Sequence, residues 1–314
     1  MSVTTVLGQV EESDLGRVDC HEHVFLRSPV LLGDDFQDLE KMVEEVRLVR
    51  QSGIDTVVDL TPIGLGRRPS WTAEVSRRTG VNIIMATGVH RHAHYPRGHW
   101  LYEIGVAELA DLLVADLEDG IDDRDWQGPR PQISKVRAGI IKLGASYHSI
   151  APSEQRWFEA GVAAALRTGV SVAVHCEIGT AMHPILDRLQ ELGLPPERVL
   201  LAHADRNLDL GLHLELSERG AFLGYDTIGR TKYHADERII ELIGRVRDHG
   251  RVGHILLGTD VGRSSMLRSY GGGPGMDVLG RVFVPRLGST LGEQTSRDLT
   301  VANPARFLRG RRLE

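Results

Sequence analysis

The feature that most constrains the fold is a repeated unit in which an amphipathic helical segment ends at a glycine and a short apolar strand follows directly. The unit recurs at Gly53, Gly80, Gly169 and Gly220, and the strands that come after them read IDTVVDL, VNIIMAT, VSVAVHC and AFLGYD. Glycine suits the left-handed residue after a helix, and a near-continuous apolar run is what a strand covered on both faces requires. The alternation of helices and strands therefore predicts a parallel sheet.

Eight apolar strands can be counted along the chain, near residues 17–22, 54–60, 81–87, 138–143, 170–175, 198–203, 221–225 and 254–259. Eight strands favour a closed TIM (β/α)8 barrel, and a doubly wound open sheet is the structural alternative. A length of 314 residues with 41% hydrophobic residues fits a single barrel domain over residues 1–314, because no linker of proline, glycine and serine divides the chain.

Helices and two long loops fit between these strands. One apolar helical stripe consists of Leu39, Met42, Val43, Val46 and Val49. The segment 88–100 is rich in histidine, and the segment 261–290 is rich in glycine. The second segment lacks the Lys-Ser/Thr pair of a phosphate-binding P-loop, so we interpret it as a mobile loop over a site.

Composition narrows the class of partner. A net charge of −6, a pI near 6.2 and 5% aromatic residues give no basic or stacking surface for nucleic acid. No stretch approaches the roughly 20 apolar residues of a membrane span, and the N-terminal segment does not have the pattern of a signal peptide. Cys20 and Cys176 are expected to be buried structural thiols rather than a disulfide, which fits a reducing cytoplasm. Small-molecule chemistry is the favoured class.

The strongest chemical signal is the run Asp19-Cys20-His21-Glu22-His23 at the end of the first strand. His21 and His23 are two residues apart on a strand, so their rings point to the same side and could share a metal ion. His175, His203 and Asp260 each end a later strand. The carboxyl ends of barrel strands meet on one face, which makes this agreement hard to attribute to separate structural roles such as helix capping.

Lys142 is the most unusual candidate, because its surroundings in GIIKLG are apolar and an ammonium cannot ligate a cation. One interpretation is a lysine paired with a nearby carboxylate. The other is a lysine that loses its proton, reacts with carbon dioxide and bridges two metals as a carbamate, because burial favours the neutral amine.

Taken in order, these residues resemble the phosphotriesterase family of the amidohydrolase superfamily. The runs that carry the resemblance are GRVDCHEHVFL, IDTVVDL, AEVSRRTGVNIIMATGV, AGIIKLG, VLLAHADRNLD and NPARFL. The resemblance implies a binuclear hydrolase with two divalent metal ions, most often zinc, with manganese or cobalt as alternatives. In that family pattern His21, His23 and Asp260 hold the more buried metal, His175 and His203 hold the more exposed one, and carboxylated Lys142 bridges them.

The same resemblance implies that a hydroxide shared by the metals attacks the substrate and that Asp260 shuttles the proton. The branch it favours hydrolyses small lactones, including phosphorylated ones, with the phosphate held by Lys232 and Arg263. The branch has a tyrosine three residues after that arginine, where this chain has Met266. Other expected substrate-binding residues are Arg230, Asp226, His90 and His92.

Two further functions remain open on the sequence alone. One is hydrolysis of organophosphate triesters, which the same metals and hydroxide can serve. The other is a metal-containing binding protein without turnover, against which the complete ligand set argues. The resemblance also implies a homodimer.

Overall fold

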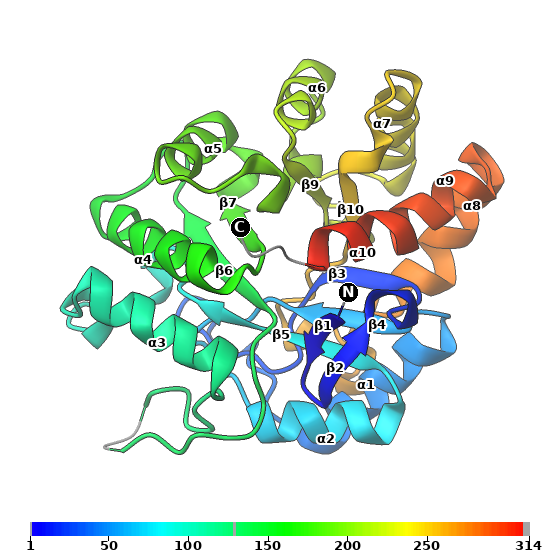
Figure 1. Ribbon diagram of the computed structural model, residues 1–314. Coiled ribbons are helices and arrows are strands. Elements are labelled where there is room, and N and C mark those ends of the chain that lie inside the picture. The colour runs from blue at the N-terminus through cyan, green and yellow to red at the C-terminus, as the bar shows by residue number, and fades with distance from the viewer. Residues whose placement is uncertain (1, 128–129, 310–314) are drawn as a thin grey trace.

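The computed structural model describes residues 2–127 and 130–309, and within them eight parallel strands form a ring surrounded by helices (Figure 1). The strands follow one another around the ring in chain order. They are β3 (Val18–Glu22), β4 (Thr56–Asp59), β5 (Asn82–Gly88), β6 (Ile140–Ala145), β7 (Val172–Cys176), β8 (Val199–Ala202), β9 (Phe222–Tyr225) and β10 (Ile255–Leu257). The predicted domain bounds at residues 1 and 314 lie outside the described residues.

The ring closes just beyond the end of β10. The backbone N–H of Asp260 donates to the carbonyl of His21 on β3 at 2.9 Å. The buried carboxylate of Glu22 accepts hydrogen bonds from the Val261 N–H at 3.0 Å and from the hydroxyl of Thr259. Because neighbouring strands are consecutive and the first meets the last, the barrel prediction is confirmed and the doubly wound alternative is excluded.

Helices cover the outside of the barrel. They are α1 (Leu39–Gln51), α2 (Pro69–Thr79), α3 (Val106–Glu118), α4 (Pro152–Thr168), α5 (Met182–Glu191), α6 (Leu210–Glu218), α7 (Asp236–Asp248), α8 (Val284–Leu291), α9 (Glu293–Arg297) and α10 (Asn303–Leu308). The predicted stripe of α1 is confirmed, since Met42, Val43, Val46 and Val49 are buried. None of the helices in the described ranges combines the length and apolar character that crossing a membrane requires.

The glycines of the repeated unit have the backbone conformation that the sequence predicts. Gly53, Gly80, Gly169 and Gly220 have φ values of 89°, 70°, 83° and 101°. This region is costly for residues that carry a Cβ, and glycine removes the cost. Each helix can therefore turn back at once into the next strand.

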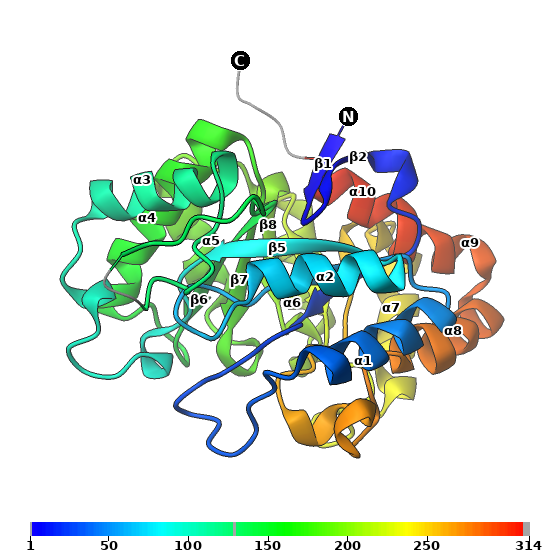
Figure 2. The same ribbon diagram turned by 90° about the horizontal axis from the view of Figure 1, so that it is seen from below.

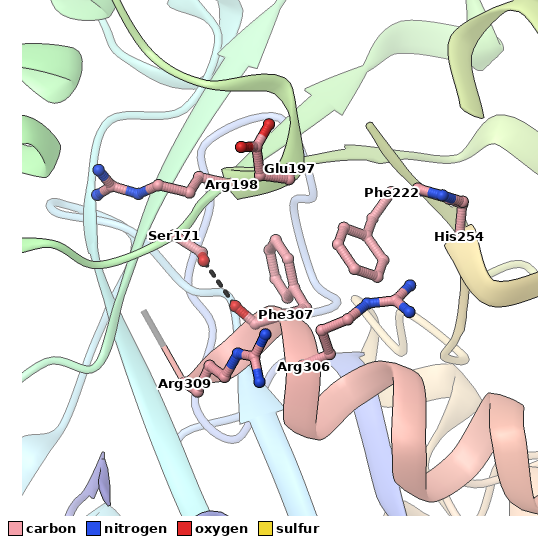
Figure 3. Close-up of a pocket in the computed structure, with 8 residues that line it drawn as sticks. All are labelled: Ser171, Glu197, Arg198, Phe222, His254, Arg306, Phe307 and Arg309. Atoms are coloured by element: carbon pink, nitrogen blue, oxygen red, sulfur yellow. Dashed lines mark hydrogen bonds between the residues drawn. The ribbon is translucent and has the colours of Figure 1, made fainter. Parts of the chain in front are cut away.

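A short antiparallel hairpin, β1 (Ser2–Thr5) and β2 (Gly8–Glu11), was not expected from the sequence. It lies on the same side of the barrel as α10, away from the loops that follow the strands (Figure 2). A pocket of about 210 Å³ also opens at the N-terminal ends of the strands, where Ser171, Phe222 and Phe307 line it (Figure 3). These features are remote from the predicted metal ligands.

The glycine-rich segment corrects one prediction. Residues 261–290 were expected to form a mobile loop, but Leu279–Phe283 form a π-helical turn that continues into α8. The loop part is tied down, because the buried carboxylate of Glu45 accepts the N–H groups of Ser269 at 2.8 Å and Met276 at 3.1 Å. The segment is therefore part loop and part helix, rather than the single loop that its glycine content suggests.

Gly88 gives a test of how closely the loop after β5 approaches β6. A Cβ at Gly88, where φ is 116°, would collide with the backbone carbonyl of Lys142. We expect Gly88→Ala to lower the free energy of unfolding by about 4 kcal/mol or more, since backbone must move. Gly80→Ala is the matched control, because no heavy atom lies within 4 Å of its Cβ and only the left-handed φ of 70° is penalised. Its expected cost is about 1 kcal/mol. Equal costs in urea unfolding would contradict the close approach.

Candidate metal centre

The six predicted metal ligands converge at the carboxyl ends of the strands. They come from five strands: His21 and His23 from the end of β3, Lys142 from within β6, His175 from β7, His203 from just after β8, and Asp260 from just after β10. Lys142 is the third residue of β6. His203 and Asp260 have φ values of 64° and 46°. Such strain costs about 1–3 kcal/mol and is typical of functional sites.

The inner nitrogen atoms of the histidines face a common space. Nε2 of His21 lies 3.3 Å from Nζ of Lys142, and Nε2 of His203 lies 2.8 Å from Nδ1 of His175. Nε2 of His23 lies 3.2 Å from Oδ1 of Asp260. Imidazole nitrogens and a carboxylate oxygen directed at one space are a ligand set that suits zinc and similar divalent ions.

Asp226 orients two of these histidines from behind. Its carboxylate oxygens lie 2.7 Å from Nδ1 of His21 and 2.6 Å from Nδ1 of His203, and they also accept the backbone N–H of His203. Burial works to raise the pKa of Asp226, but His203 and His21 bring it well below the ordinary value. An ionised carboxylate that accepts the Nδ1 protons leaves both Nε2 atoms with lone pairs for a metal.

Glu177 has a related contact with His175. Its Oε2 lies 2.6 Å from Nε2 of His175 and 3.1 Å from Nε of Arg91. The carboxylate therefore fixes the ring so that Nδ1 faces His203. Sequence reasoning missed this residue, although Glu177 stands two positions after a predicted ligand.

Lys142 is almost fully buried, with 1% of its surface exposed. Within the described part of the chain its side chain forms no ion pair at 4.0 Å or less, and the one hydrogen-bond contact of its Nζ is Nε2 of His21. Burial lowers the pKa of Lys142 to about 8. Burial also lowers the pKa of His21 to about 3 and that of His203 to about 4. The cluster therefore favours neutral nitrogen atoms, which are the form that binds metals.

Two triads of this cluster could hold a metal ion: His21, His23 and Asp260, and His21, His203 and Asp226. In the second triad the Nδ1 atoms already make short hydrogen bonds to Asp226. The inner space bounded by the Nε2 atoms is therefore the better position, and the residues present fit a divalent metal centre.

A pocket of about 170 Å³ opens onto this cluster, and its walls differ in character. We group its lining residues by their chemistry and call three of these groups the cationic wall, the apolar wall and the histidine wall. The cationic wall consists of Arg206, Arg230, Lys232 and Arg263. The apolar wall consists of Leu26, Leu31 and Leu65, and the histidine wall consists of His90 and His94. Glu177, Tyr233 and Gly262 also line the pocket, together with the candidate ligands His21, His23, His175 and Asp260.

Two arginines converge on the outer oxygen of Asp260. Nη1 of Arg230 lies 2.9 Å and Nη2 of Arg206 lies 3.3 Å from Oδ2. Burial opposes ionisation, but Arg230 and the ligand histidines hold the pKa of Asp260 well below its usual range. The guanidinium of Arg206 also stacks 4.4 Å from the ring centroid of Tyr233. Arg206 was missed as a site residue, although it follows the ligand His203 by three positions.

The structure corrects two predicted substrate-binding residues. Asp226 is 1% exposed and is hydrogen-bonded behind the ligands, so it does not line the pocket. His92 contacts Glu154 at 2.9 Å and the hydroxyl of Ser146, and it also lies outside the pocket lining. The loop turns between His90 and His94, so alternate residues do not share a face as they would on a strand.

The other four predicted substrate-binding residues line the pocket: His90, Arg230, Lys232 and Arg263. Arg263 is partly engaged, because its Nη1 lies 2.7 Å from Oδ2 of Asp34. Nζ of Lys232 lies 4.7 Å from the ring centroid of Tyr233. Burial lowers the pKa of His90, and it lowers that of His94 to about 3.

Comparison with known proteins decides the family. The model of the phosphotriesterase family matches residues 1–308. The chain belongs to the phosphotriesterase family. As a member of this family of metal-dependent hydrolases, it is a hydrolytic enzyme with histidine and aspartate groups that could bind metal.

Three relatives show which proteins within the phosphotriesterase family this chain resembles. It is 30% identical over 97% of its length to a protein named phospho-furanose lactonase of Mycoplasmopsis synoviae, 90% of which is covered. An amidohydrolase structure from Mycoplasma synoviae has a TM-score of 0.94 at 29% identity and covers 100% of this chain and 94% of the other. The phosphotriesterase homology protein of Escherichia coli, solved with phosphate in its active site, has a TM-score of 0.85 at 28% identity, with 94% and 99% coverage.

Asp226→Asn tests the orienting carboxylate. An amide cannot accept both Nδ1 protons as an anion does, so we expect the affinity for zinc to fall about 10- to 100-fold. The measurement is competition with a chelator of known affinity. Asp111→Asn on α3, whose side chain is 70% exposed, is the control and should not change zinc affinity. An unchanged affinity in Asp226→Asn would show that the histidines are oriented without it.

Proposed function

We propose that this enzyme is a lactonase for small polar lactones that carry a phosphate, and that it works with two divalent metal ions. One observation carries the proposal: the pocket above the metal-ligand cluster has four cationic side chains, Arg206, Arg230, Lys232 and Arg263. Cations at this density suit a dianionic group on the substrate. The relative named phospho-furanose lactonase supports the same substrate class.

The proposed division of the metal ligands follows the geometry of the cluster. The more buried metal would be held by His21, His23 and Asp260, the more exposed one by His175 and His203, with Lys142 between them. Zinc is the expected ion, and manganese or cobalt also suit this donor set. Bound there, the metals would supply Lewis acidity that polarises the lactone carbonyl and lowers the pKa of the attacking water.

A carbamate on Lys142 completes this proposal. The side chain is buried, forms no ion pair with a carboxylate of residues 2–127 and 130–309, and has its Nζ 3.3 Å from Nε2 of His21. Reaction of its neutral amine with carbon dioxide would replace a poorly accommodated ammonium with an anion that has two oxygen donors.

Asp260 is the proposed proton carrier. Its Oδ1 faces His23, while Oδ2 lies on the side of the pocket between Arg206 and Arg230. We assign Oδ2 as the atom that takes the proton of the attacking water and delivers it to the leaving alkoxide. The two arginines would keep that oxygen directed toward the substrate.

The cationic wall also favours the lactonase over the alternative functions. A neutral organophosphate triester offers no anionic group to the four cationic side chains, so triester hydrolysis is expected only as a weaker activity. The remaining alternative is a metal protein that binds a lactone without opening it. We further propose that the chain forms one domain and that the protein is a homodimer in the cytoplasm. Size-exclusion chromatography with light scattering tests the oligomeric state.

A substrate panel tests the proposal directly. Zinc- or manganese-loaded protein would be assayed on phosphorylated sugar lactones, their unphosphorylated forms, alkyl lactones and an aryl dialkyl phosphate. We expect the highest kcat/KM for the phosphorylated lactones. A preference for the triester would overturn the lactonase proposal, and tight lactone binding without ring opening would favour the binding protein.

Lys142→Ala tests the bridging role. We expect loss of one or both metals and of nearly all activity, because the bridge contributes ligand atoms to both positions. Metal content measured by mass spectrometry is the direct readout. Added short carboxylates should restore part of both metal content and activity by taking the place of the carbamate. Full metal content and activity without them would rule out the carbamate.

Lys232→Ala tests the anion-binding wall. The KM for a phosphorylated lactone should rise about tenfold or more, while kcat/KM for the unphosphorylated lactone stays the same. The group that is lost contacts a part of the substrate remote from the reacting carbonyl. Lys135→Ala, near the N-terminal hairpin, is the matched control for the loss of one positive charge. An equal effect on both substrates would contradict a phosphate contact.

A further inference from the structure

His90 and His94 line the pocket but belong neither to the candidate metal ligands nor to the cationic wall. The two rings stack with centroids 4.0 Å apart, and the ring of His90 lies 4.6 Å from that of the ligand His175. Both line the same pocket as Asp260. A role for the histidine wall in choosing the substrate rests on the proposed lactonase function.

The protonation of His90 is fixed by the backbone. The N–H of Arg91 donates to Nδ1 of His90 at 2.7 Å. A nitrogen that accepts a hydrogen bond carries a lone pair, so the neutral ring has its proton on Nε2. The loop that holds this geometry is itself fixed, because the His90 N–H donates to the hydroxyl of Tyr95 at 2.9 Å, and that hydroxyl donates to the carbonyl of Ile63 at 2.8 Å.

Nε2 of His90 is therefore a hydrogen-bond donor. It makes no hydrogen bond within residues 2–127 and 130–309. The atom is not fully buried, so a bound molecule can reach it. Since His90 lines the pocket, this N–H faces the substrate space beside His175. His94 backs the ring and is held by Ser28, whose hydroxyl lies 2.9 Å from its Nδ1.

We propose that His90 is a specificity-determining residue whose Nε2–H donates to a hydroxyl oxygen of the lactone ring, so that the enzyme selects hydroxylated lactones over deoxy or alkyl lactones. The donor is uncharged and fixed, which suits a neutral acceptor rather than the anionic group proposed for the cationic side chains. An alkyl lactone would cover the N–H and leave it unpaired. A hydroxyl group on the ring instead takes over the hydrogen bond of the water that the substrate displaces.

Three substitutions separate the donor from the space that the ring fills. His90→Gln places an amide N–H close to the position of Nε2, His90→Asn has a shorter side chain that cannot reach it, and His90→Leu removes all polarity. The assay compares kcat/KM for a hydroxylated lactone with that for the matched deoxy lactone. We expect His90→Leu and His90→Asn to lose about 10- to 100-fold on the hydroxylated lactone only. His90→Gln should retain most of the preference.

Two controls make the result decisive. His249→Gln, at an exposed histidine that caps α7, should leave the preference unchanged. Zinc content is measured for every variant. Equal loss on both lactones, or loss of zinc in His90→Leu, would overturn the proposal, because either shows that His90 acts by positioning His175. If the wild type opens no lactone at all, the proposed function fails. If it opens both lactones and His90→Leu keeps the same preference, only the role of His90 fails.

Discussion

The candidate site depends on one buried carboxylate. Asp226, just after β9, binds the outer nitrogen atoms of His21 from β3 and His203 from the end of β8. These three segments are far apart in sequence and meet only in the barrel. Burial makes an ionised carboxylate costly unless it is fully hydrogen-bonded, and here the two histidines supply that stabilisation. The same contacts fix the tautomer that leaves Nε2 of each ring available for a metal.

The hydrogen bonds that close the barrel also place the candidate ligands. The hydrogen bond from the Asp260 N–H to the carbonyl of His21 joins the end of the β10 segment to β3, and both residues are candidate ligands. Glu22, between His21 and His23, takes part in closure through Val261 and Thr259. Loss of closure would therefore separate the ligands, which explains why the left-handed conformation of Asp260 is maintained.

The pocket above this centre is lined by side chains of different chemical character, and the proposed substrate follows from that difference. Cationic side chains such as Arg230 and Lys232 form one wall, while the neutral pair His90 and His94 forms another. An anionic group and a neutral polar ring would each find a matching surface. A substrate that is apolar throughout would leave charged and polar groups desolvated without partners, which is unfavourable.

The sequence by itself determined the barrel and its candidate ligands, because strand periodicity, glycine after each helix, and residues at strand ends such as His21, His175 and Asp260 are local patterns. Only the tertiary structure decided what lies behind and above them. Asp226 lies behind two candidate ligands, His92 contacts Glu154 outside the pocket lining, and Arg206 joins the cationic wall. These roles depend on which side chains from distant segments meet and on the path of irregular loops. Neither of these produces a repeating pattern of residues in the sequence.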